Sequence, residues 1–501
     1  MTKLANDIPS LTSMLEVMRH DARESYFKFF KVFWDTVVPG DDYVHNWHIE
    51  YLCDELQKVG QWVINREPKR YDLIINVSPG ESKSTLATVL FPCWLWANDD
   101  TTRIISSSYS ADLSRGHASL SRDCINSQLY QLCFPKVQVR EDMDNKRLYK
   151  TESGGFRLSV STGSAVTGEH GHLILIDDPV DPRGAKSEAI MASANEHVFR
   201  TLPSRKVDKE KTPTILIMQR LGMNDPTAGY LERSEDMPIK HIFLPATDEY
   251  PISEDTFKSK PIRGYYQTYM NPNRTGEKVL REQRAALGSI DFAGQYGQQP
   301  MDLQGNIMKR DWLQIIEDYQ LPDAVRKASP DFVVDTAYTD FQSACPSAIL
   351  SYVEHKGYCF ILDYQEVYLT FGNLVKFLHD KVSAMGGNRS RIYIEPKASG
   401  KSTAQVMKSP DLMSAWNLNT RLNVIEWKMT EGDKVTRLVN VTPYWEAKRV
   451  FIVRGPTTDH YTKELLAFPR GTRTEAADLS VMASVNCFDR KVYQGYSAAT
   501  A

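Results

Sequence analysis

Several features that mark other protein classes are missing from these 501 residues. No apolar run approaches the roughly eighteen residues needed to cross a bilayer, and the N-terminus MTKLANDIPS lacks the basic-then-apolar pattern of a secretion signal. The seven cysteines are scattered and contain no Cys-x-x-Cys pair, which argues against a disulfide framework or a zinc site. We therefore expect a reduced, intracellular protein with no membrane segment.

The sequence also has little net charge of either sign. Its formal net charge is −3, so any contact with nucleic acid must come from local basic patches instead of a bulk positive field. Hydrophobic residues make up 42% and charged residues 25%, which is ordinary for a globular protein. The length predicts roughly two to four domains, and we find no internal repeat.

Residues 71–88, YDLIINVSPGESKSTLAT, are the most informative stretch. The run from Leu73 to Val77 predicts a buried parallel strand, followed by a turn and then a helix from Lys83. This arrangement forms a phosphate cradle, in which Lys83 would reach the β- and γ-phosphates of ATP and the Ser84 hydroxyl would bind Mg²⁺. The predicted nucleotide-binding residues in the loop are Ser78, Pro79, Gly80, Glu81, Ser82, Lys83, Ser84 and Thr85.

The loop matches the GxxxxGK[ST] motif incompletely. Val77 and Ser82 occupy the two glycine positions, and only Gly80 gives the loop backbone freedom. A surface turn that happens to contain Lys-Ser is the alternative interpretation.

A second informative stretch is HLILIDD, residues 172–178, an apolar run that ends in two aspartates. Asp177 could hold Mg²⁺ through its water shell, and Asp178 could orient and deprotonate the attacking water. The alternative is a strand that ends in a solvated Asp-Asp-Pro turn. Gln219 or Arg220, after the strand at 214–219, could sense the γ-phosphate, or could simply be the polar cap of that strand.

The elements fall into four parts. Residues 1–45 are an N-terminal helical segment, and in 46–247 strands at 73–77, 103–109, 156–161, 173–176 and 214–219 alternate with helices such as 110–130. That alternation predicts a parallel α/β sheet with its site at the strand C-termini. Trp47 and His48 could stack on an adenine, but a packed aromatic cap is favoured. Residues 248–328 form a connecting region with short helices, and 329–501 a second α/β domain.

The second domain places three carboxylates at the ends of elements. Asp335 ends the first strand of an antiparallel meander (332–334, 348–353 and 358–363), Glu395 ends a strand at 391–395, and Asp478 opens a late helix. Carboxylates that converge in this way can bind two metal ions for phosphodiester cleavage. Each one alone could instead be a solvated strand or helix end.

Together these stretches resemble the large subunit of a tailed-bacteriophage terminase, the motor and nuclease that packages viral DNA. The resemblance runs from about Asn46 to Asp489 and rests on stretches in the correct order: INVSPGESKST, LILIDDPVD, QYGQQPMDLQGNIMKRDW, VVDTAYT, YIEPKASGKS, GDKVTRL and AADLSVMASV. It implies an α/β fold with a P-loop (ASCE-type) ATPase domain followed by an RNase H-like nuclease domain. Lys83, Ser84, Asp177 and Asp178 fall on its ATPase positions, and Asp335, Glu395 and Asp478 fall on its nuclease carboxylates.

The resemblance also implies a function. ATP hydrolysis would move double-stranded DNA into a procapsid, and an Mg²⁺-dependent endonuclease, which could also use Mn²⁺, would cut concatemeric DNA. Implied partners are the terminase small subunit, the portal protein and further copies in a ring, in the host cytoplasm and not in the mature virion. The alternatives are a helicase-nuclease of repair or recombination, and a DNA-binding scaffold with a decayed ATPase.

Two departures from the family pattern stand out. Asp178 replaces the Glu of many members. The segment 167–171 has no arginine that could act as an arginine finger to the neighbouring subunit, so the finger is either one of Arg115, Arg122 and Arg220 or is replaced. Basic residues that could contact DNA phosphates lie in both halves, with Lys434 and Arg437 ranked first because they fall in GDKVTRL. The full set is Arg200, Arg205, Lys206, Lys209, Lys211, Lys397, Lys401, Lys434, Arg437, Arg470 and Arg473.

Overall fold

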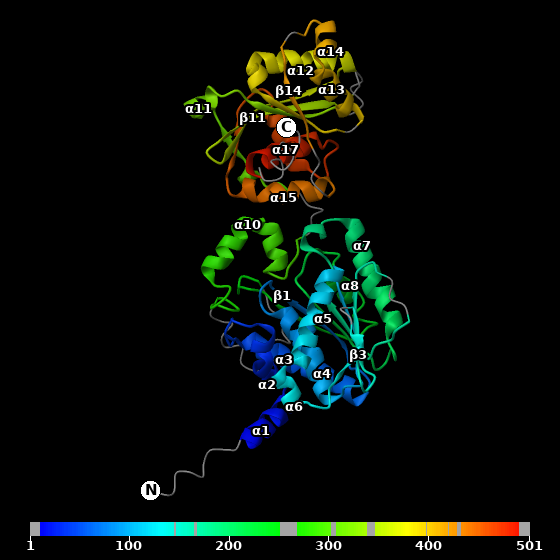
Figure 1. The fold of residues 1–501 in the computed structure, drawn as a ribbon. Coiled ribbons are helices and arrows are strands. Elements are labelled where there is room, and N and C mark those ends of the chain that lie inside the picture. Colours follow the sequence, from blue (N-terminus) through cyan, green and yellow to red (C-terminus); the bar gives the residue numbers. More distant parts are fainter. Residues whose placement is uncertain are drawn as a thin grey trace. The chain divides into compact units, whose positions relative to one another are not determined.

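Two β-sheets organise the chain, one in each of two units (Figure 1). The computed structural model describes residues 11–144, 147–164, 168–250, 268–301, 307–337, 346–396, 398–418, 420–427 and 432–489. The first unit comprises Met1–Arg284 with Ser289–Met301, and the second comprises Ala285–Gly288 with Asp302–Ala501. The mixed α/β fold class is confirmed, whereas the domain boundaries drawn at 46, 248 and 329 stay predictions.

The first unit is built on an eight-stranded sheet of order β3-β4-β5-β2-β6-β7-β1-β8. All neighbouring pairs are parallel except those that involve β3 and β4, which are antiparallel at one edge. The strands are β1 (Asp72–Val77), β2 (Arg103–Ser108), β3 (Val139–Asp144), β4 (Leu148–Thr151), β5 (Phe156–Ser161), β6 (Leu173–Asp177), β7 (Thr214–Met218) and β8 (Ile239–Leu244).

Hydrophobic cores cover both faces of this sheet. Within β1, Leu73 and Ile75 pack into one cluster while Ile74 packs into the other, because successive side chains of a strand point to opposite faces. The helices of this unit are α1 (Leu11–Glu24), α2 (Tyr26–Val37), α3 (Trp47–Asn65), η1 (Thr85–Leu90), α4 (Phe91–Asn98), α5 (Ala111–Asn126), α6 (Gln128–Cys133), α7 (Glu188–Glu196), α8 (Pro226–Glu232) and most of α10 (Glu277–Gln295).

Two helix predictions need correction. The helix expected over 110–130 is two helices, since Ser127 ends α5 and its hydroxyl accepts the Tyr130 N–H at the start of α6. The connecting region, expected to hold short helices, contains the 19-residue α10, which is interrupted at Gly288 with φ of 74°. Glycine takes this left-handed conformation without a steric penalty.

The second unit has a seven-stranded sheet of order β14-β13-β10-β11-β12-β15-β9. The strands β10, β11 and β12 form the predicted antiparallel meander, and β13 pairs in parallel with β10. Their bounds are β9 (Gln314–Ile316), β10 (Asp331–Asp335), β11 (Ser347–His355), β12 (Tyr358–Val367), β13 (Arg391–Ile394), β14 (Asn423–Glu426) and β15 (Val450–Val453).

Helices cover this second sheet as well. One hydrophobic cluster joins α12 (Phe371–Met385) and α13 (Ala398–Lys408) to β10 and β13, and α17 (Glu475–Phe488) packs on β10 and β11. The others are α11 (Asp323–Arg326), α14 (Pro410–Ala415), α15 (Lys434–Glu446) and α16 (Thr458–Ala467). Among the described residues no helix is both long and apolar enough to cross a membrane.

Candidate active sites

The predicted phosphate loop follows β1 at the carboxyl edge of the first sheet. Because β6, β7 and β1 are parallel neighbours, the residues after each of them meet at this edge. Two residues of the loop have positive φ, Gly80 at 80° and Ser82 at 60°, and the chain is helical from Lys83. Ser82 thus adopts the left-handed backbone expected of the glycine that it replaces, and such loop conformations aim successive amides at an anion.

Lys83 joins the loop to the ends of β6 and β7. Its Nζ lies 2.7 Å from Asp178 Oδ2 and donates to Gln219 Oε1 at 3.4 Å. The Asp178 backbone has a positive φ of 43°, and its amide donates to the Ile217 carbonyl. Burial raises the pKa of Asp178, as does the charge of Asp177, against the lowering effect of Lys83. The structure therefore brings together three residues predicted from three distant motifs.

Asp177 lies next to this pair at the end of β6 and is fully buried. Neither carboxylate oxygen makes a well-formed hydrogen bond to a described residue. Burial raises the pKa of Asp177, while the charge of Lys83 and the Ser84 and Thr88 hydroxyls lower it. A buried carboxylate beside a serine hydroxyl supplies the oxygen ligands that Mg²⁺ prefers, so Asp177 and Ser84 fit a divalent cation.

His117 of α5 completes the surroundings of Asp177. Its Nδ1 lies 3.3 Å from Asp177 Oδ2. Burial, with the charge of Arg157, lowers the pKa of His117 to about 4, so the imidazole is neutral near pH 7 and does not balance the carboxylate charge.

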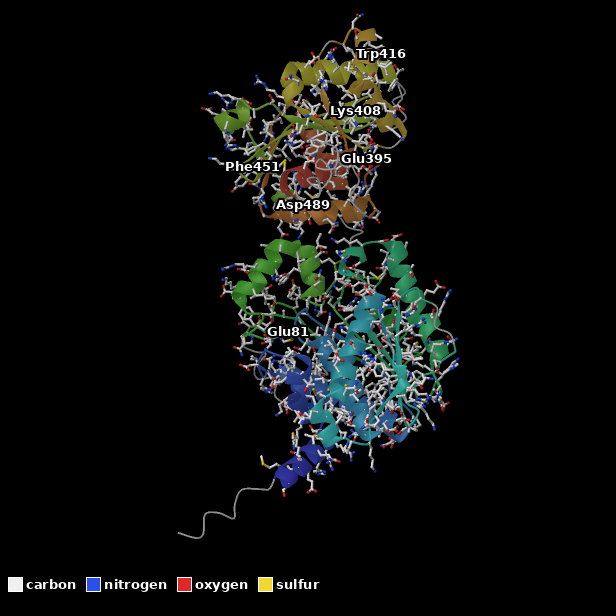
Figure 2. All side chains as sticks on the ribbon, in the orientation of Figure 1. Glu81, Glu395, Lys408, Trp416, Phe451 and Asp489 are labelled. Carbon is white, nitrogen blue, oxygen red and sulfur yellow. The ribbon has the colours of Figure 1, made fainter. Side chains whose placement is uncertain are left out.

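Glu81, labelled in Figure 2, anchors the loop through its side chain. Its buried carboxylate accepts hydrogen bonds from the Thr275 hydroxyl at 2.6 Å and the Asn271 amide at 2.7 Å. His48 Nε2 lies 3.6 Å from the same carboxylate and is 1% exposed. The side chain of Glu81 is therefore committed to these partners, and only its backbone remains for the predicted nucleotide contact.

The adenine-stacking hypothesis fails for His48, because a ring so deeply buried cannot meet a base. Burial lowers the pKa of His48 to about 4. The indole of Trp47 donates to the Met270 carbonyl at 3.2 Å, so the favoured interpretation of a packed aromatic cap fits the structure.

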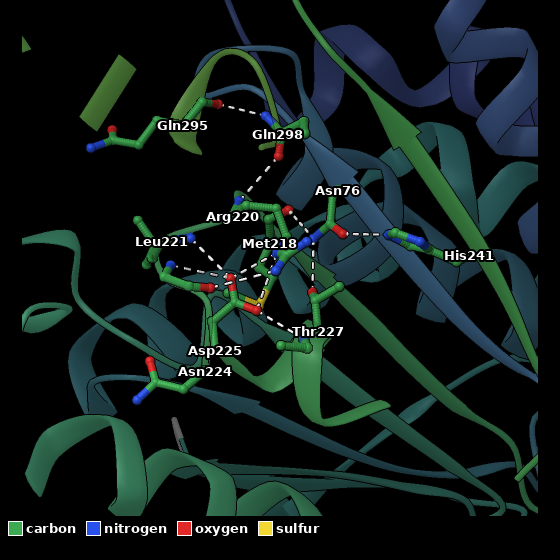
Figure 3. Close-up of polar contacts among 12 residues, drawn as sticks. Asn76, Met218, Arg220, Leu221, Asn224, Asp225, Thr227, His241, Gln295 and Gln298 are labelled. Carbon is green, nitrogen blue, oxygen red and sulfur yellow. Dashed lines mark hydrogen bonds and ion pairs between the residues drawn. The ribbon is translucent and has the colours of Figure 1, made fainter. Parts of the chain in front are cut away.

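Arg220 is paired with a buried aspartate. Its Nε donates to both carboxylate oxygens of Asp225, at 2.9 and 3.1 Å, and its backbone N–H donates to Gln298 (Figure 3). Asp225 also caps α8 by accepting the Ala228 N–H. Arg220 is thus neither a phosphate sensor nor an available arginine finger. Arg115 is exposed, and among the described residues it forms an ion pair with Asp112 on its own helix.

The three carboxylates of the second unit lie at one edge of its sheet. Asp335 ends β10, and Glu395 follows β13, its parallel neighbour. Asp478 lies in the first turn of α17 and is 7% exposed, while Glu395 is 5% exposed. Two cations of α15, Arg437 and Lys434, contact these carboxylates. Arg437 lies 3.7 Å from both Glu395 and Asp478.

Lys434 is the second of these cations. Its Nζ lies 2.5 Å from Asp478 Oδ2 and donates to the Thr474 hydroxyl at 2.7 Å. Burial lowers the pKa of Lys434, but the bond to Asp478 and the charges of Asp478, Asp335 and Glu475 outweigh it, so the pKa is raised. Each of the three predicted carboxylates therefore acts on at least one of these two cations: Asp478 on both, Glu395 on Arg437 and Asp335 on Lys434. Their oxygens are the donors expected for Mg²⁺ or Mn²⁺.

These contacts correct the ranking of the DNA patches. Arg437 is 6% exposed and held between two carboxylates, so it cannot contact a DNA phosphate in this arrangement. Lys206 is also buried, 3.6 Å from Asp72. Lys397 lies outside the described residues, while the exposed members of the patches are Arg200, Lys209, Lys211, Lys401 and Arg470.

Sequence reasoning missed the partners of the predicted residues. His117 beside Asp177, the Asn271–Thr275 pair on Glu81 and Arg437 on Glu395 all come from distant positions. No motif surrounds His117, Asn271 or Thr275. Arg437 lies in GDKVTRL, but that stretch indicated contact with DNA and not with Glu395.

No family model and no curated protein matches the sequence. The structure is similar to the large terminase of a thermophilic bacteriophage in complex with ADP, at 10% identity and a TM-score of 0.43, over 88% of this chain and 99% of that chain. The HK97 bacteriophage large terminase is similar over 92% of this chain and 99% of its own, at 11% identity and a TM-score of 0.37. The human cytomegalovirus terminase nuclease domain is similar over 32% of this chain and 85% of its own, at 12% identity and a TM-score of 0.26. Likeness at this level does not assign an activity.

Proposed function

We propose that this protein is the large subunit of a tailed-bacteriophage terminase, which couples ATP hydrolysis to DNA packaging and carries a metal-dependent endonuclease. The observation that carries the proposal is the presence of two separate acidic centres in one chain. Lys83 joins Asp178 and Gln219 beside the buried Asp177 in the first unit. In the second unit, Glu395 and Asp478 share Arg437 at a sheet edge.

In the first centre, Lys83 would supply positive charge and Asp178 would supply a general base. Mg²⁺, held by Ser84 and by Asp177 through its water shell, would neutralise phosphate charge when bound. Lys83 now pairs with Asp178, and a nucleotide in the loop would draw its ammonium toward the phosphates. Asp178 would then be free to accept a proton from the attacking water, a role that its raised pKa favours.

In the second centre, Asp335, Glu395 and Asp478 would hold Mg²⁺ or Mn²⁺, which bind the scissile phosphate and activate water. Arg437 and Lys434 balance the carboxylates in the structure described here. Binding of the metal would therefore require these cations to release some of the oxygens that they contact.

The proposed packaging of DNA also implies how the protein would contact DNA and its protein partners. The DNA would be double-stranded and contacted through phosphates, since packaging must accept any sequence. A ring of copies docked on the portal would let Arg115 or Arg122 of one copy act at the next copy's nucleotide, with the small subunit supplying recognition, in the host cytoplasm. Each of these partners is a proposal.

The test is plasmid cleavage with Mg²⁺ or Mn²⁺ and ATP turnover, measured on the same samples. We expect Asp335→Ala and Glu395→Ala to lose cleavage and keep ATP turnover, and Lys83→Ala to show the reverse. Asp411→Ala, an exposed carboxylate of the second unit, should keep both activities.

Cleavage that survives both carboxylate substitutions would reject the nuclease assignment. ATP turnover that is indistinguishable from buffer in the unaltered protein would instead favour a scaffold with a decayed ATPase. Unwinding of a forked duplex would favour the helicase-nuclease alternative.

A further inference from the structure

A short segment beyond the first sheet lies directly against the phosphate loop. Asn271 and Thr275 bind the Glu81 carboxylate, and between them Arg274 Nη1 donates to the Ser82 hydroxyl at 3.3 Å. The segment is about 190 positions away in sequence, since the hydrogen bond from Arg274 to Ser82 spans 192 residues. Tertiary packing, and not a local motif, therefore brings a guanidinium to the loop.

The backbone that carries Arg274 is firmly held. Asn271 and Thr275 are each 5% exposed, and the N–H groups of Arg274 and Thr275 both donate to the Asn271 carbonyl. The preceding residue, Met270, donates its N–H to the Ala246 carbonyl and accepts from the Asn46 amide through its carbonyl. Buried hydrogen bonds of this kind fix position, so Arg274 projects from a rigid support.

The guanidinium itself is exposed, in contrast to its support. It makes one hydrogen bond to Ser82, and a guanidinium carries five N–H donors in a planar fork that matches phosphate oxygens. Its positive charge acts on the loop, because it lowers the pKa of Glu81 against the larger effect of burial and lowers that of His48. Within the loop, Lys83 is already paired with Asp178.

Ser82 is the residue where the loop turns. Ser82, with φ of 60°, stands between Gly80, with φ of 80°, and the helical Lys83. Loop conformations of this kind can aim successive amides at one anion. A cation that touches the Ser82 hydroxyl is therefore next to the place where the phosphates of a nucleotide would lie.

We propose that Arg274 binds the phosphate chain of the nucleotide, as a second cation beside Lys83. The proposal rests on the proposed nucleotide site and adds a ligand to it from outside the predicted motifs. Arg274 exchanges its bond to Ser82 for the phosphate oxygens, and Asn271 and Thr275 keep it in reach by holding Glu81.

The experiment measures binding of ADP, ATP and adenosine to the full-length protein by titration calorimetry in the presence of Mg²⁺. We expect Arg274→Ala to weaken ADP and ATP binding about ten-fold or more, the effect of losing one charge-assisted phosphate contact, and to leave adenosine binding unchanged. The salt dependence of ADP binding should also decrease, and Arg274→Lys should restore part of the affinity.

Arg281→Ala is the matched control, because Arg281 is an exposed arginine on α10 and its loss changes net charge equally. Thermal unfolding of each variant checks that the fold is kept, and adenosine binding checks that the pocket is intact. A loss of ADP affinity in Arg274→Ala no larger than that in Arg281→Ala overturns the proposal, as does an equal loss for adenosine.

Lys83→Ala separates this proposal from the one on which it rests. If Lys83→Ala loses ADP binding and Arg274→Ala does not, the nucleotide site stands and the role of Arg274 is rejected. If the unaltered protein binds neither ADP nor ATP, both proposals fall.

Discussion

At the scale of single residues, two buried aspartates near the first sheet edge differ in how their charge is compensated. Asp225 is held by Arg220, with Nε–oxygen distances of 2.9 and 3.1 Å, and it also caps α8. Asp177 has no comparable bond to a described residue and lies beside a neutral His117. The charge of Lys83 and the Ser84 and Thr88 hydroxyls lower the pKa of Asp177, but burial outweighs them. A buried charge that is only partly compensated costs free energy of folding and is retained where function requires it.

Asp177→Asn should therefore raise the free energy of unfolding in metal-free buffer by about 1 kcal/mol, because it removes a buried charge without changing the side-chain volume. The same variant should lose ATP turnover. Urea unfolding in EDTA and an ATPase assay measure the two effects.

Asp225→Asn is the matched control, since the chemical change is identical. Here the substitution leaves the guanidinium of Arg220 buried without its counter-charge, so the free energy of unfolding should fall by about 3 kcal/mol. Equal destabilisation by both substitutions would show that Asp177 is as well compensated as Asp225.

At the scale of elements, the first turn of α15 holds two other elements together. Arg437 contacts Glu395 after β13 and Asp478 in α17. Asp433 caps the helix by accepting the Thr436 N–H at 2.7 Å, which fixes where this turn begins. The helix thus supplies the positive charge that balances the acidic edge of the second sheet.

Arg437→Met should destabilise the second unit by about 3 kcal/mol in EDTA, because two buried carboxylates lose a shared counter-charge while the side-chain volume is roughly kept. Mn²⁺ should then raise the melting temperature of this variant by more than it raises that of the unaltered protein. Differential scanning calorimetry with and without Mn²⁺ measures both.

Arg454→Met provides the comparison, since Arg454 forms a half-exposed pair with Glu317 elsewhere in the same unit. Its free energy of unfolding should change by less than about 0.5 kcal/mol, with no added response to Mn²⁺. If Mn²⁺ stabilises Arg437→Met no more than the unaltered protein, the carboxylates near Arg437 do not form the metal site.

At the scale of the whole molecule, the two units contain groups with opposite responses to pH. In the first unit, burial lowers the pKa of His197 to about 4. In the second unit, burial raises the pKa of Glu464 to about 7. The nearby Glu366 also raises this pKa, whereas the hydrogen bond from the Ala476 N–H lowers it. In the unfolded chain, His197 has its ordinary pKa of 6.5 and Glu464 its ordinary pKa of 4.5.

We expect the stability difference between the unaltered protein and each glutamine variant to change with pH in opposite directions. Relative to His197→Gln, the unaltered protein should lose about 3 kcal/mol as pH falls from 6.5 to 4, because the unfolded state binds the extra proton. Relative to Glu464→Gln, it should lose on the order of 3 kcal/mol as pH rises from 4.5 to 7, because the folded state must release one.

Chemical denaturation across this pH range, followed separately for each unit, measures both slopes. His170→Gln, an exposed histidine of the first unit, is the comparison for the first slope. Slopes of the same sign for His197→Gln and Glu464→Gln would contradict the assignment of opposite buried protonation states.

Much of the fold was predictable because its signals are local. Runs of β-branched residues predicted β1, β6 and β7, and the positions of Asp177 and Asp335 at strand ends followed from the same patterns. The strands β3, β4, β8, β9, β14 and β15 were not predicted. Of these, β4, β9, β14 and β15 have only three or four residues, which carry little periodicity. The break between α5 and α6 escaped because one serine cap decides it.

The sequence by itself determined which residue types stand at the ends of the strands, because alternation, turns and helix starts depend on neighbours in the chain. Tertiary structure alone decided which of those residues meet. Lys83 binds an aspartate 95 positions away, and Thr275 binds Glu81 across 194 positions, through strand order and packing. Arg437 likewise faces Glu395 and Asp478 and not solvent, since burial and counter-charge at a sheet edge arise only when distant elements pack together.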